Sequence, residues 1–196
     1  MKLETKRLIL RYPRKSDWKD IVEGIKDIKV SRYLTTVPYP YKKKDADWWI
    51  NDCIKRSRKK KKESYNFVIE LKSEKKVIGG TGLHKINLRD QTAETGSWIA
   101  KKYWRNHFIT EAKIAVNNYA FNKLKLRKLT SKAFTTNKAS NTMLKKLGYK
   151  LEGTLRKAHR PKSTGKIHDV NVYGLLKEEW KTHRKELIKY LNKKLK

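Results

Sequence analysis

The sequence is poor in the features that mark secreted, zinc-bound or multidomain proteins. Its 196 residues include one cysteine, Cys53, which excludes an intramolecular disulfide and a zinc site built from cysteines. Only 4 prolines occur, and no internal repeat or Gly/Ser-rich linker marks a domain boundary. The length therefore predicts a single domain with a sizeable core.

Long apolar runs are also missing. No segment approaches the roughly 18 apolar residues of a membrane span. The first eleven residues, MKLETKRLILR, lack the apolar core of a signal peptide. We therefore expect a cytoplasmic protein without a membrane segment.

Acidic residues are scarce, since 51 Lys and Arg face 19 Asp and Glu, which gives a formal net charge of +32. This excess fits contact with nucleic acid, attraction of acidic substrates, or solvated lysines without a partner. Zinc-finger spacing, RNP-like strands and Gly-x-x-Gly clamps are all missing. Because 37% of the residues are hydrophobic, a disordered polycation is excluded.

The hydrophobic pattern predicts an α+β fold. We expect a strand over 3–12, a helix begun by Ser16 and Asp17, a loop over 30–44 and a helix capped by Asp45 in which Cys53 packs in the core. An antiparallel meander follows over 64–71, 76–88 and 92–100. A helix over 110–124 between strands 92–100 and 126–134 predicts a parallel crossover.

The C-terminal third is predicted to hold a helix from Asn137 to its Gly148 cap and a strand pair over 149–158 and 167–176. The tail after Glu178 is an amphipathic helix whose apolar face holds Trp180, Leu187, Ile188, Leu191 and Leu195. We divide the chain into a main domain over 1–180 and a basic amphipathic helix over 181–196.

The strand 92–100, the loop after it and the helix start near Thr110 form the most informative segment. Unpaired N–H groups and the positive end of the helix dipole meet there, which favours an anion such as pyrophosphate. The residues YWRNHFITEA in this segment resemble the acetyl-CoA loop of the GNAT acetyltransferases, in particular the RimJ/RimL type. AETGSWIA, TTNKASNTMLKKLGYKLEGTLR and LETKRLILR resemble further blocks of that family, so the similarity covers about residues 3–180.

The resemblance implies the GNAT acyl-CoA N-acyltransferase fold, a mostly antiparallel mixed sheet with a splayed parallel strand pair that holds acetyl-CoA as co-substrate, without a metal. Backbone groups of Trp98, Ile99 and Ala100 would align the acetyl group. Asn137 would contact pantetheine or water, and Ser140 would protonate the leaving thiolate because Leu144 replaces the usual tyrosine. A first-turn serine bonded to the backbone is the alternative for Ser140. The pyrophosphate would lie on the loop residues Arg105, Asn106, His107, Phe108, Ile109 and Thr110.

Glu94 is the candidate base for the incoming amine, and a surface cross-strand carboxylate is the equal alternative. An α-amine with a pKa near 7.7–8.0 is roughly a tenth neutral at pH 7, whereas a lysine amine is neutral at only about 0.1% or below. A weak base would therefore suffice for protein N-termini, the substrates that a RimJ/RimL-type enzyme implies. Polyamines and other small amines remain open.

Two residues depart from the family pattern in the loop. His107 occupies a glycine slot and Ile109 a Gly/Ala slot, although glycine lets a backbone bend tightly near phosphate. Asn106 and His107 tolerate unusual φ angles, the donors are main-chain groups, and Arg105 or a protonated His107 would add charge. We expect an intact cofactor site.

Weaker substrate contacts are predicted for Tyr33, Trp49 and His84, with packing as the alternative. GGTG, just before His84, predicts close strand packing because no P-loop pattern follows it, and the other histidines lack metal-ligand spacing. A competing function is a catalytically weakened domain that binds RNA or the ribosome through its basic surface, and either a monomer or a homodimer is compatible with the sequence.

Overall fold

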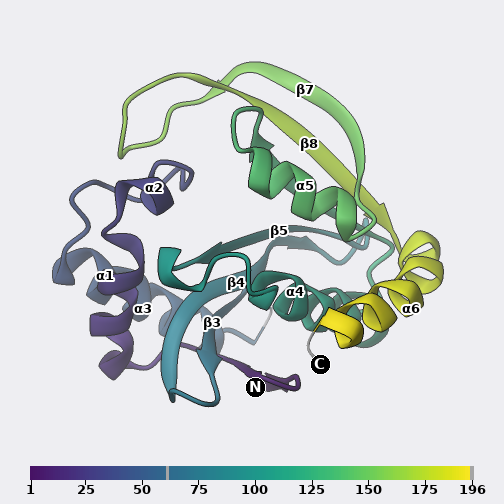
Figure 1. Ribbon diagram of the computed structural model, residues 1–196, viewed down its shortest axis with the longest axis horizontal. Helices are drawn as coiled ribbons and strands as arrows, with labels where there is room; N and C mark the ends of the chain where they lie inside the picture. Colours follow the sequence, from purple (N-terminus) through teal and green to yellow (C-terminus); the bar gives the residue numbers. More distant parts are fainter. Residues whose placement is uncertain (61, 195–196) are drawn as a thin grey trace.

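The computed structural model describes residues 1–60 and 62–194. An eight-stranded mixed sheet runs through it in the order β1-β2-β3-β4-β5-β6-β8-β7 (Figure 1). The strands are β1 (Lys2–Glu4), β2 (Leu8–Arg11), β3 (Tyr65–Leu71), β4 (Lys76–Asn87), β5 (Thr92–Ile99), β6 (Lys128–Phe134), β7 (Lys150–His159) and β8 (His168–Leu176).

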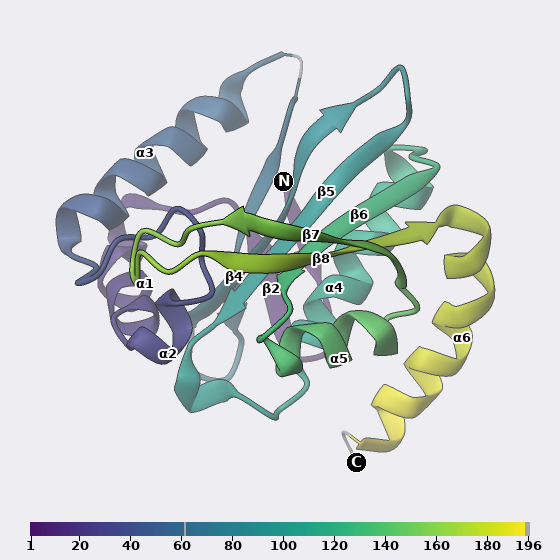
Figure 2. The ribbon, with the colours of Figure 1, turned by 90° about the horizontal axis from the view of Figure 1, so that it is seen from above.

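Helices cover the sheet, as Figure 2 shows from above. The α-helices are α1 (Trp18–Ile25), α2 (Ile28–Ser31), α3 (Lys43–Arg58), α4 (Phe108–Asn118), α5 (Lys138–Lys146) and α6 (Lys177–Lys194). The shorter turns are η1 (Lys15–Asp17), η2 (Lys101–Tyr103) and η3 (Tyr119–Lys123), the last a π-helical continuation of α4. The predicted α+β class, meander and crossover helix are confirmed.

The strands β5 and β6 are the parallel pair of this sheet. Their register runs from Thr92 opposite Lys128 to Thr95 opposite Ser131 and stops there. Both strands continue beyond that point, β5 to Ile99 and β6 to Phe134. The two strands therefore diverge after Thr95 and Ser131, which is the predicted splay.

Two hydrophobic clusters pack on the sheet. The larger cluster lies between α4 and the strands from β2 through β6, and it includes Leu8, Phe67 and Ala112. The smaller one joins α1 and α3 to the sheet through Ile21, Ile50 and Val68. Val68 lies between Phe67 and Ile69, which face the other cluster, so the period-two alternation of β3 places its side chains on both sides.

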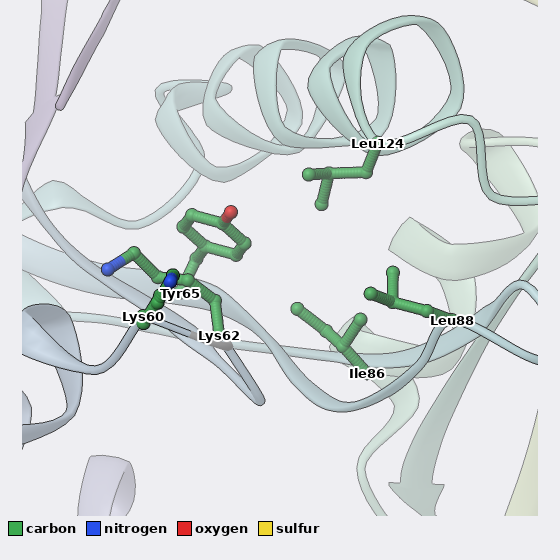
Figure 3. A pocket seen from close by; sticks show the side chains of 6 residues that line it. All are labelled: Lys60, Lys62, Tyr65, Ile86, Leu88 and Leu124. Atoms are coloured by element: carbon green, nitrogen blue, oxygen red, sulfur yellow. The ribbon is translucent and has the colours of Figure 1, made fainter.

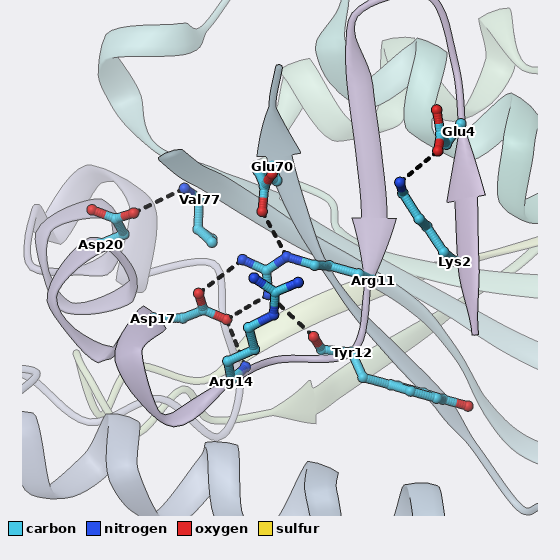
Figure 4. Close-up of polar contacts among 9 residues, drawn as sticks. All are labelled: Lys2, Glu4, Arg11, Tyr12, Arg14, Asp17, Asp20, Glu70 and Val77. Carbon is cyan, nitrogen blue, oxygen red and sulfur yellow. Dashed lines mark hydrogen bonds and ion pairs between the residues drawn. The ribbon is translucent and has the colours of Figure 1, made fainter. Parts of the chain in front are cut away.

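An ion network fixes the start of α1 against the sheet (Figure 4). Arg11 of β2 donates to both carboxylate oxygens of Asp17, at 2.8 and 2.9 Å, and to Glu70 of β3 at 2.6 Å. Asp17 also accepts the backbone N–H of Arg14 at 2.7 Å. The charges are largely buried and mutually paired, so they orient the chain entry into α1.

Three boundaries differ from the sequence-based expectations. The strand expected over 3–12 is a hairpin, because Thr5 bonds Leu8 through its backbone and side chain and turns the chain. The loop expected over 30–44 begins inside α2. Asp45 is not the cap of α3: it lies in the first turn and accepts the N–H of Lys42, which precedes the helix.

The terminal helix α6 belongs to the main core. Trp180, Leu187 and Leu191 are buried in the larger cluster, while Ile188 is 37% exposed and Leu195 lies outside the described residues. The expected division between residues 180 and 181 falls inside this helix. Among the described residues, no helix is long and apolar enough to span a membrane.

Candidate active site

The site is built around the point where β5 and β6 separate. Ala100 N–H donates to Ile78 on β4 at 2.9 Å, and its carbonyl accepts from Tyr103. Backbone groups alternate sides along a strand, so those of Ser97 and Ile99 point toward the divergent β6. The backbone groups of Ala100 are thus bonded within the protein, those of Trp98 face β4 by the same alternation, and the carbonyl of Ile99 accepts from Trp104 Nε1 at 3.0 Å. Ser97, which no sequence signal singled out, presents its groups to the open side.

The amino end of α4 follows β5 after a short connection. The first helical hydrogen bond runs from Glu111 N–H to the carbonyl of His107 at 3.0 Å. The N–H groups of Phe108, Ile109 and Thr110 precede it and point out of the helix end. Together with the helix dipole they form a group of main-chain donors that fits a pyrophosphate.

The loop before α4 uses the left-handed backbone region twice. Arg105 has φ 65° and His107 has φ 61°, at the second of which the family pattern has glycine. Burial and the nearby charges of Lys146 and Arg7 lower the pKa of His107, so the ring is neutral at pH 7. This shift disfavours the protonated form of His107 and leaves Arg105 as the other expected source of positive charge in the loop. The His107 ring lies edge-on to Tyr190 of α6, with 6.1 Å between the ring centres.

Arg7, in the turn between β1 and β2, holds this loop in place. Its Nη2 donates to the carbonyl of Asn106 at 2.9 Å, and its Nε donates to Glu111 at 2.7 Å. The guanidinium also lies over the ring of Phe108 at 4.2 Å. Sequence reasoning missed this clamp, because its two sides lie about a hundred residues apart.

The start of α5 lies after the end of β6, as the start of α4 lies after β5. Asn137 is the N-cap, and its Oδ1 accepts the N–H of Ser140 at 3.2 Å. Ser140 is half-buried in the first turn. The two segments predicted to contact the co-substrate thus follow the carboxyl ends of the two diverging strands.

Glu94 lies on the face of β5 turned away from α4, directly opposite His84 of β4. Its carboxylate is paired to Lys85 at 2.9 Å and lies 3.8 Å from Lys132 of β6. Burial lowers the pKa of His84, while Glu94 opposes that shift, so the imidazole is neutral at pH 7. This face therefore combines a neutral imidazole with a carboxylate held between two amines.

The GGTG run makes room for an indole, as predicted from packing. A side-chain atom at Gly80 would lie 2.5 Å from Trp98 Nε1, and one at Gly24 of α1 would lie 2.8 Å from the same indole. Trp98 therefore points into the α1 side of the sheet. Trp49 packs in the smaller cluster, and the ring of Tyr33 lies tilted against that of Phe134 at the end of β6, with 6.4 Å between the ring centres.

The hairpin of β7 and β8 reaches across to α2 over the Glu94 side of the sheet (Figure 1). Lys162 N–H donates to the carbonyl of Thr35 at 3.1 Å, and Ser163 Oγ donates to that of Ser31 at 3.0 Å. Tyr33 lies between these two acceptors in the sequence, and its ring is beside Phe134 at the end of β6.

A hollow of about 500 Å³ lies at the opposite end of the sheet (Figure 3). Its walls come from the far ends of β4 and η3, and it is lined by Lys60, Lys62, Tyr65, Ile86, Leu88 and Leu124. It is thus separate from the loop and helix starts described above.

No group of three or more potential metal ligands occurs among residues 1–60 and 62–194. Cys53 is buried, and burial raises the pKa of its thiol to about 12, so packing is its role as predicted.

Comparisons with known proteins agree with this geometry. Residues 7–150 match the acetyltransferase (GNAT) domain family. The uncharacterized N-acetyltransferase YoaA of Bacillus subtilis (strain 168) is 32% identical in an alignment 180 residues long, which covers 89% of this chain and 96% of YoaA.

Two solved structures share the fold. The ribosomal-protein-S5-alanine acetyltransferase of Vibrio fischeri superposes with a TM-score of 0.77 at 15% identity, over 92% of this chain and 98% of its own. The microcin C7 self-immunity acetyltransferase MccE, solved with acetyl-CoA and AMP, superposes with a TM-score of 0.71 at 20% identity, over 88% and 93%. Family match, relative and fold agree, and the chain belongs to the GNAT acetyltransferases, which use acetyl-CoA as acetyl donor.

Proposed function

We propose that this chain transfers the acetyl group of acetyl-CoA to the α-amino group at the N-terminus of a protein. The observation that carries the choice of acceptor is the cross-strand pair of His84 and Glu94. Support also comes from the resemblance to the RimJ/RimL type and from the similar fold of the Vibrio fischeri protein, which is a ribosomal-protein-S5-alanine acetyltransferase.

The pair offers a mild base. The pKa of His84 lies below its ordinary value of 6.5, so the neutral ring is free at pH 7 to accept a proton from the amine but holds it weakly. An α-amine with a pKa near 7.7–8.0 needs little help to become neutral, whereas a lysine amine near 10.4 needs far more. His84 and Glu94 therefore suit an α-amine.

The residues of the chain have the following roles in this proposal. Main-chain N–H groups at Phe108, Ile109 and Thr110 bind the pyrophosphate, and Asn137 contacts the pantetheine. When bound, acetyl-CoA supplies a thioester whose carbonyl carbon forms a bond to the amine nitrogen while the C–S bond breaks. Glu94 and His84 take up the proton of the amine, and Ser140 lies near the departing sulfur.

Peptides with a free and a formylated N-terminus, each with one internal lysine, test the acceptor. Mass spectrometry should locate the acetyl group on the α-nitrogen of the free peptide, and the formylated peptide should give no product. Spermidine serves as the small-amine control. Acetylation of spermidine without acetylation of either peptide would overturn the proposed acceptor.

A second candidate, RNA or ribosome binding, is supported by the net charge of +32. A strand with all but its last residue exposed, β7, adds Lys150, Arg156 and Lys157 to this surface. If RNA is the partner, the affinity should fall steeply as salt rises, because counterions are released on binding. Failure to bind acetyl-CoA at millimolar concentration, combined with salt-sensitive RNA binding, would favour this candidate over the enzyme.

A further inference from the structure

A lysine of α4 is buried without an acid to pair with. Lys113 is 1% exposed, and its Nζ donates to the hydroxyl of Thr95 on β5 at 2.8 Å. Tyr149, at the start of the chain segment leading into β7, lies close by, with the Lys113 amine 5.7 Å from its ring centre. These groups occupy the α4 face of β5, opposite to the face that carries Glu94.

A chain of hydrogen bonds extends from this amine. The Thr95 and Tyr149 hydroxyls lie 3.4 Å apart, and Tyr149 donates to Asn117 Oδ1 at 3.2 Å. Asn117, one helical turn after Lys113, is fully buried, and its Nδ2 has no hydrogen-bond partner within the described residues. The groups of this cluster that still lack a hydrogen-bond partner, the Asn117 amide N–H groups and the remaining N–H groups of the Lys113 ammonium, are thus donors.

Among residues 1–60 and 62–194, no carboxylate pairs with Lys113 to offset the free energy of burying its charge. From the β7 side Tyr149 faces it, with a pKa raised to about 12 by burial. From β4 the charge of Lys113 acts on His84 across the sheet and helps to lower that pKa. Burial alone lowers the pKa of Lys113 itself to about 7, so the amine exchanges a proton in the neutral range.

The position of Thr95 connects this cluster to the site. Thr95 is the last residue of β5 in register with β6, and its carbonyl accepts from Ser131 Oγ at 3.0 Å. A ligand inserted between the diverging strands from their open ends stops at this pair. The backbone of Thr95 therefore lies at the inner end of the opening between the two strands. Its hydroxyl projects from the same residue onto the α4 face, where Lys113 donates to it.

A proton source is needed at that place. The serine hydroxyl predicted to protonate the thiolate can pass a proton on but does not store one at pH 7. Among the described residues, no hydrogen bond joins the Ser140 hydroxyl to a group that would resupply it; the bond of Ser140 is through its backbone N–H. Lys113 supplies what Ser140 lacks, an ammonium group hydrogen-bonded to a hydroxyl.

We propose that Lys113 is a positioning residue that stores the proton for the acetyl transfer and passes it through the Thr95 hydroxyl to the departing thiolate. This inference rests on the proposed acetyltransferase reaction but on no particular amine. The thiolate leaves with the electron pair of the C–S bond and takes the proton of Thr95, which takes one from Lys113. The amine nitrogen releases its proton on the Glu94 side, and the neutral Lys113 regains a proton from solvent after the products leave.

Lys113→Met is the principal test, because methionine keeps the length of the side chain and removes the proton. With whichever amine the wild type acetylates fastest, kcat should fall about 100-fold or more, within the range of general acid catalysis. The acetyl-CoA Kd from calorimetry should change less than about twofold, since Lys113 lies behind Thr95. The wild-type decline of kcat as pH rises above about 7 should be missing in the variant.

Tyr149→Phe is the matched control, because it removes a hydroxyl from the same cluster and leaves the bond between Lys113 and Thr95. Its kcat and pH profile should resemble those of the wild type. If Ser140→Ala reproduces the loss while Lys113→Met keeps the wild-type kcat and profile, the proposal is overturned. A wild type that acetylates no amine refutes the proposed function instead, so the two failures are distinguishable.

A readout without turnover completes the test. In the ligand-free protein with ¹³C-labelled lysine, the Cε signal that disappears in Lys113→Met should titrate near pH 7. Titration of that signal near the ordinary value of 10.5 would overturn the role of Lys113 as a proton store. Should Lys113→Met fail to fold, Thr95→Val provides the kinetic arm, with the same expected loss of kcat.

Discussion

The two faces of β5 treat charge in opposite ways. On one face Glu94, with its side chain 32% exposed, lies between the amines of Lys85 and Lys132. On the other face Lys113 is buried and bonded to the neutral hydroxyl of Thr95. Glu94 and Thr95 are adjacent in one strand, yet their partners differ. Glu94 forms ion pairs that water screens, whereas Thr95 accepts a hydrogen bond from a buried amine that has no carboxylate partner.

The two faces of β5 contribute differently to the free energy of unfolding. A partly exposed ion pair contributes little, because water and salt screen it. A buried amine without a carboxylate destabilises the folded state, because the charged form loses its hydration. Such a group persists in an otherwise apolar interior when something other than stability requires it.

The largest effect is expected for Lys113→Met, which should raise the unfolding free energy by roughly 3 to 5 kcal/mol at pH 7. The pKa of Lys113 is about 7 in the folded state and 10.5 ordinarily. Between these values the unfolded chain binds a proton that the folded chain does not, so wild-type stability falls as pH decreases from 10.5 to 7. Urea denaturation at pH 7 and pH 10 should show the advantage of the variant shrinking at the higher pH. An equal advantage at both pH values would mean that it comes from packing.

Thr95→Val should lower the unfolding free energy by about 2 kcal/mol, because it leaves the buried amine without an acceptor. Valine has nearly the shape of threonine, so packing is preserved. Added to Lys113→Met, the same change should cost less than about 1 kcal/mol, since no donor remains to be satisfied. Denaturant titration of both single variants and the double variant measures this coupling, and additive effects would contradict it.

His107→Gly separates the strain of the His107 backbone from the contacts of its ring. With φ at 61°, His107 occupies a region that costs an L-residue about 1 kcal/mol, and glycine relieves it. Part of the gain is offset by the greater freedom of glycine in the unfolded chain, so the net rise should be at most about 1 kcal/mol. Asn106→Gly, at a neighbouring position without positive φ, is the control and should lower the melting temperature. A lower melting temperature for both variants would show that the His107 ring matters more than its backbone.

Glu94→Gln should have the smallest effect on stability, below about 1 kcal/mol, and this effect should shrink in 1 M salt. The difference due to Lys113→Met should be insensitive to salt, which sharpens the contrast between the two faces. Glu94→Gln should also flatten the acid limb of the pH–rate profile, because a proton acceptor is lost. A superimposable profile would make Glu94 a structural residue.

Much of the fold was predictable because its signals are local. The meander from β3 to β5 follows from short alternating runs and turn residues, and the α5 boundaries follow from Asn137 and Gly148, which has φ 86°. The hairpin of β1 and β2 was missed because the turn at Thr5 depends on a side-chain bond rather than on glycine or proline. The cap of α3 was misplaced because an aspartate in the first turn resembles one at the N-cap.

The site was predictable only in part. Motif spacing identified the loop before α4, but the clamp by Arg7 joins residues about a hundred positions apart and has no local signal. Lys113 was missed because a lysine beside an apolar stripe is normally solvated, whereas α4 is buried on most of its surface. The spacing of Lys113 and Asn117, one helical turn apart on a face with buried neighbours, is the signal that would have found the cluster.

The contact between α6 and the end of α5 has a mechanical consequence. His183 bonds the carbonyl of Lys146 at 2.8 Å, and its ring fills the space that a side chain at Gly148 would need. At 1.5 Å per residue, the nine residues of α5 form a rod about 14 Å long, with Asn137 and Ser140 at its other end. The terminal helix therefore anchors the carboxyl end of α5, and we expect a displacement of His183 to shift Asn137 and Ser140 at the other end of this rod.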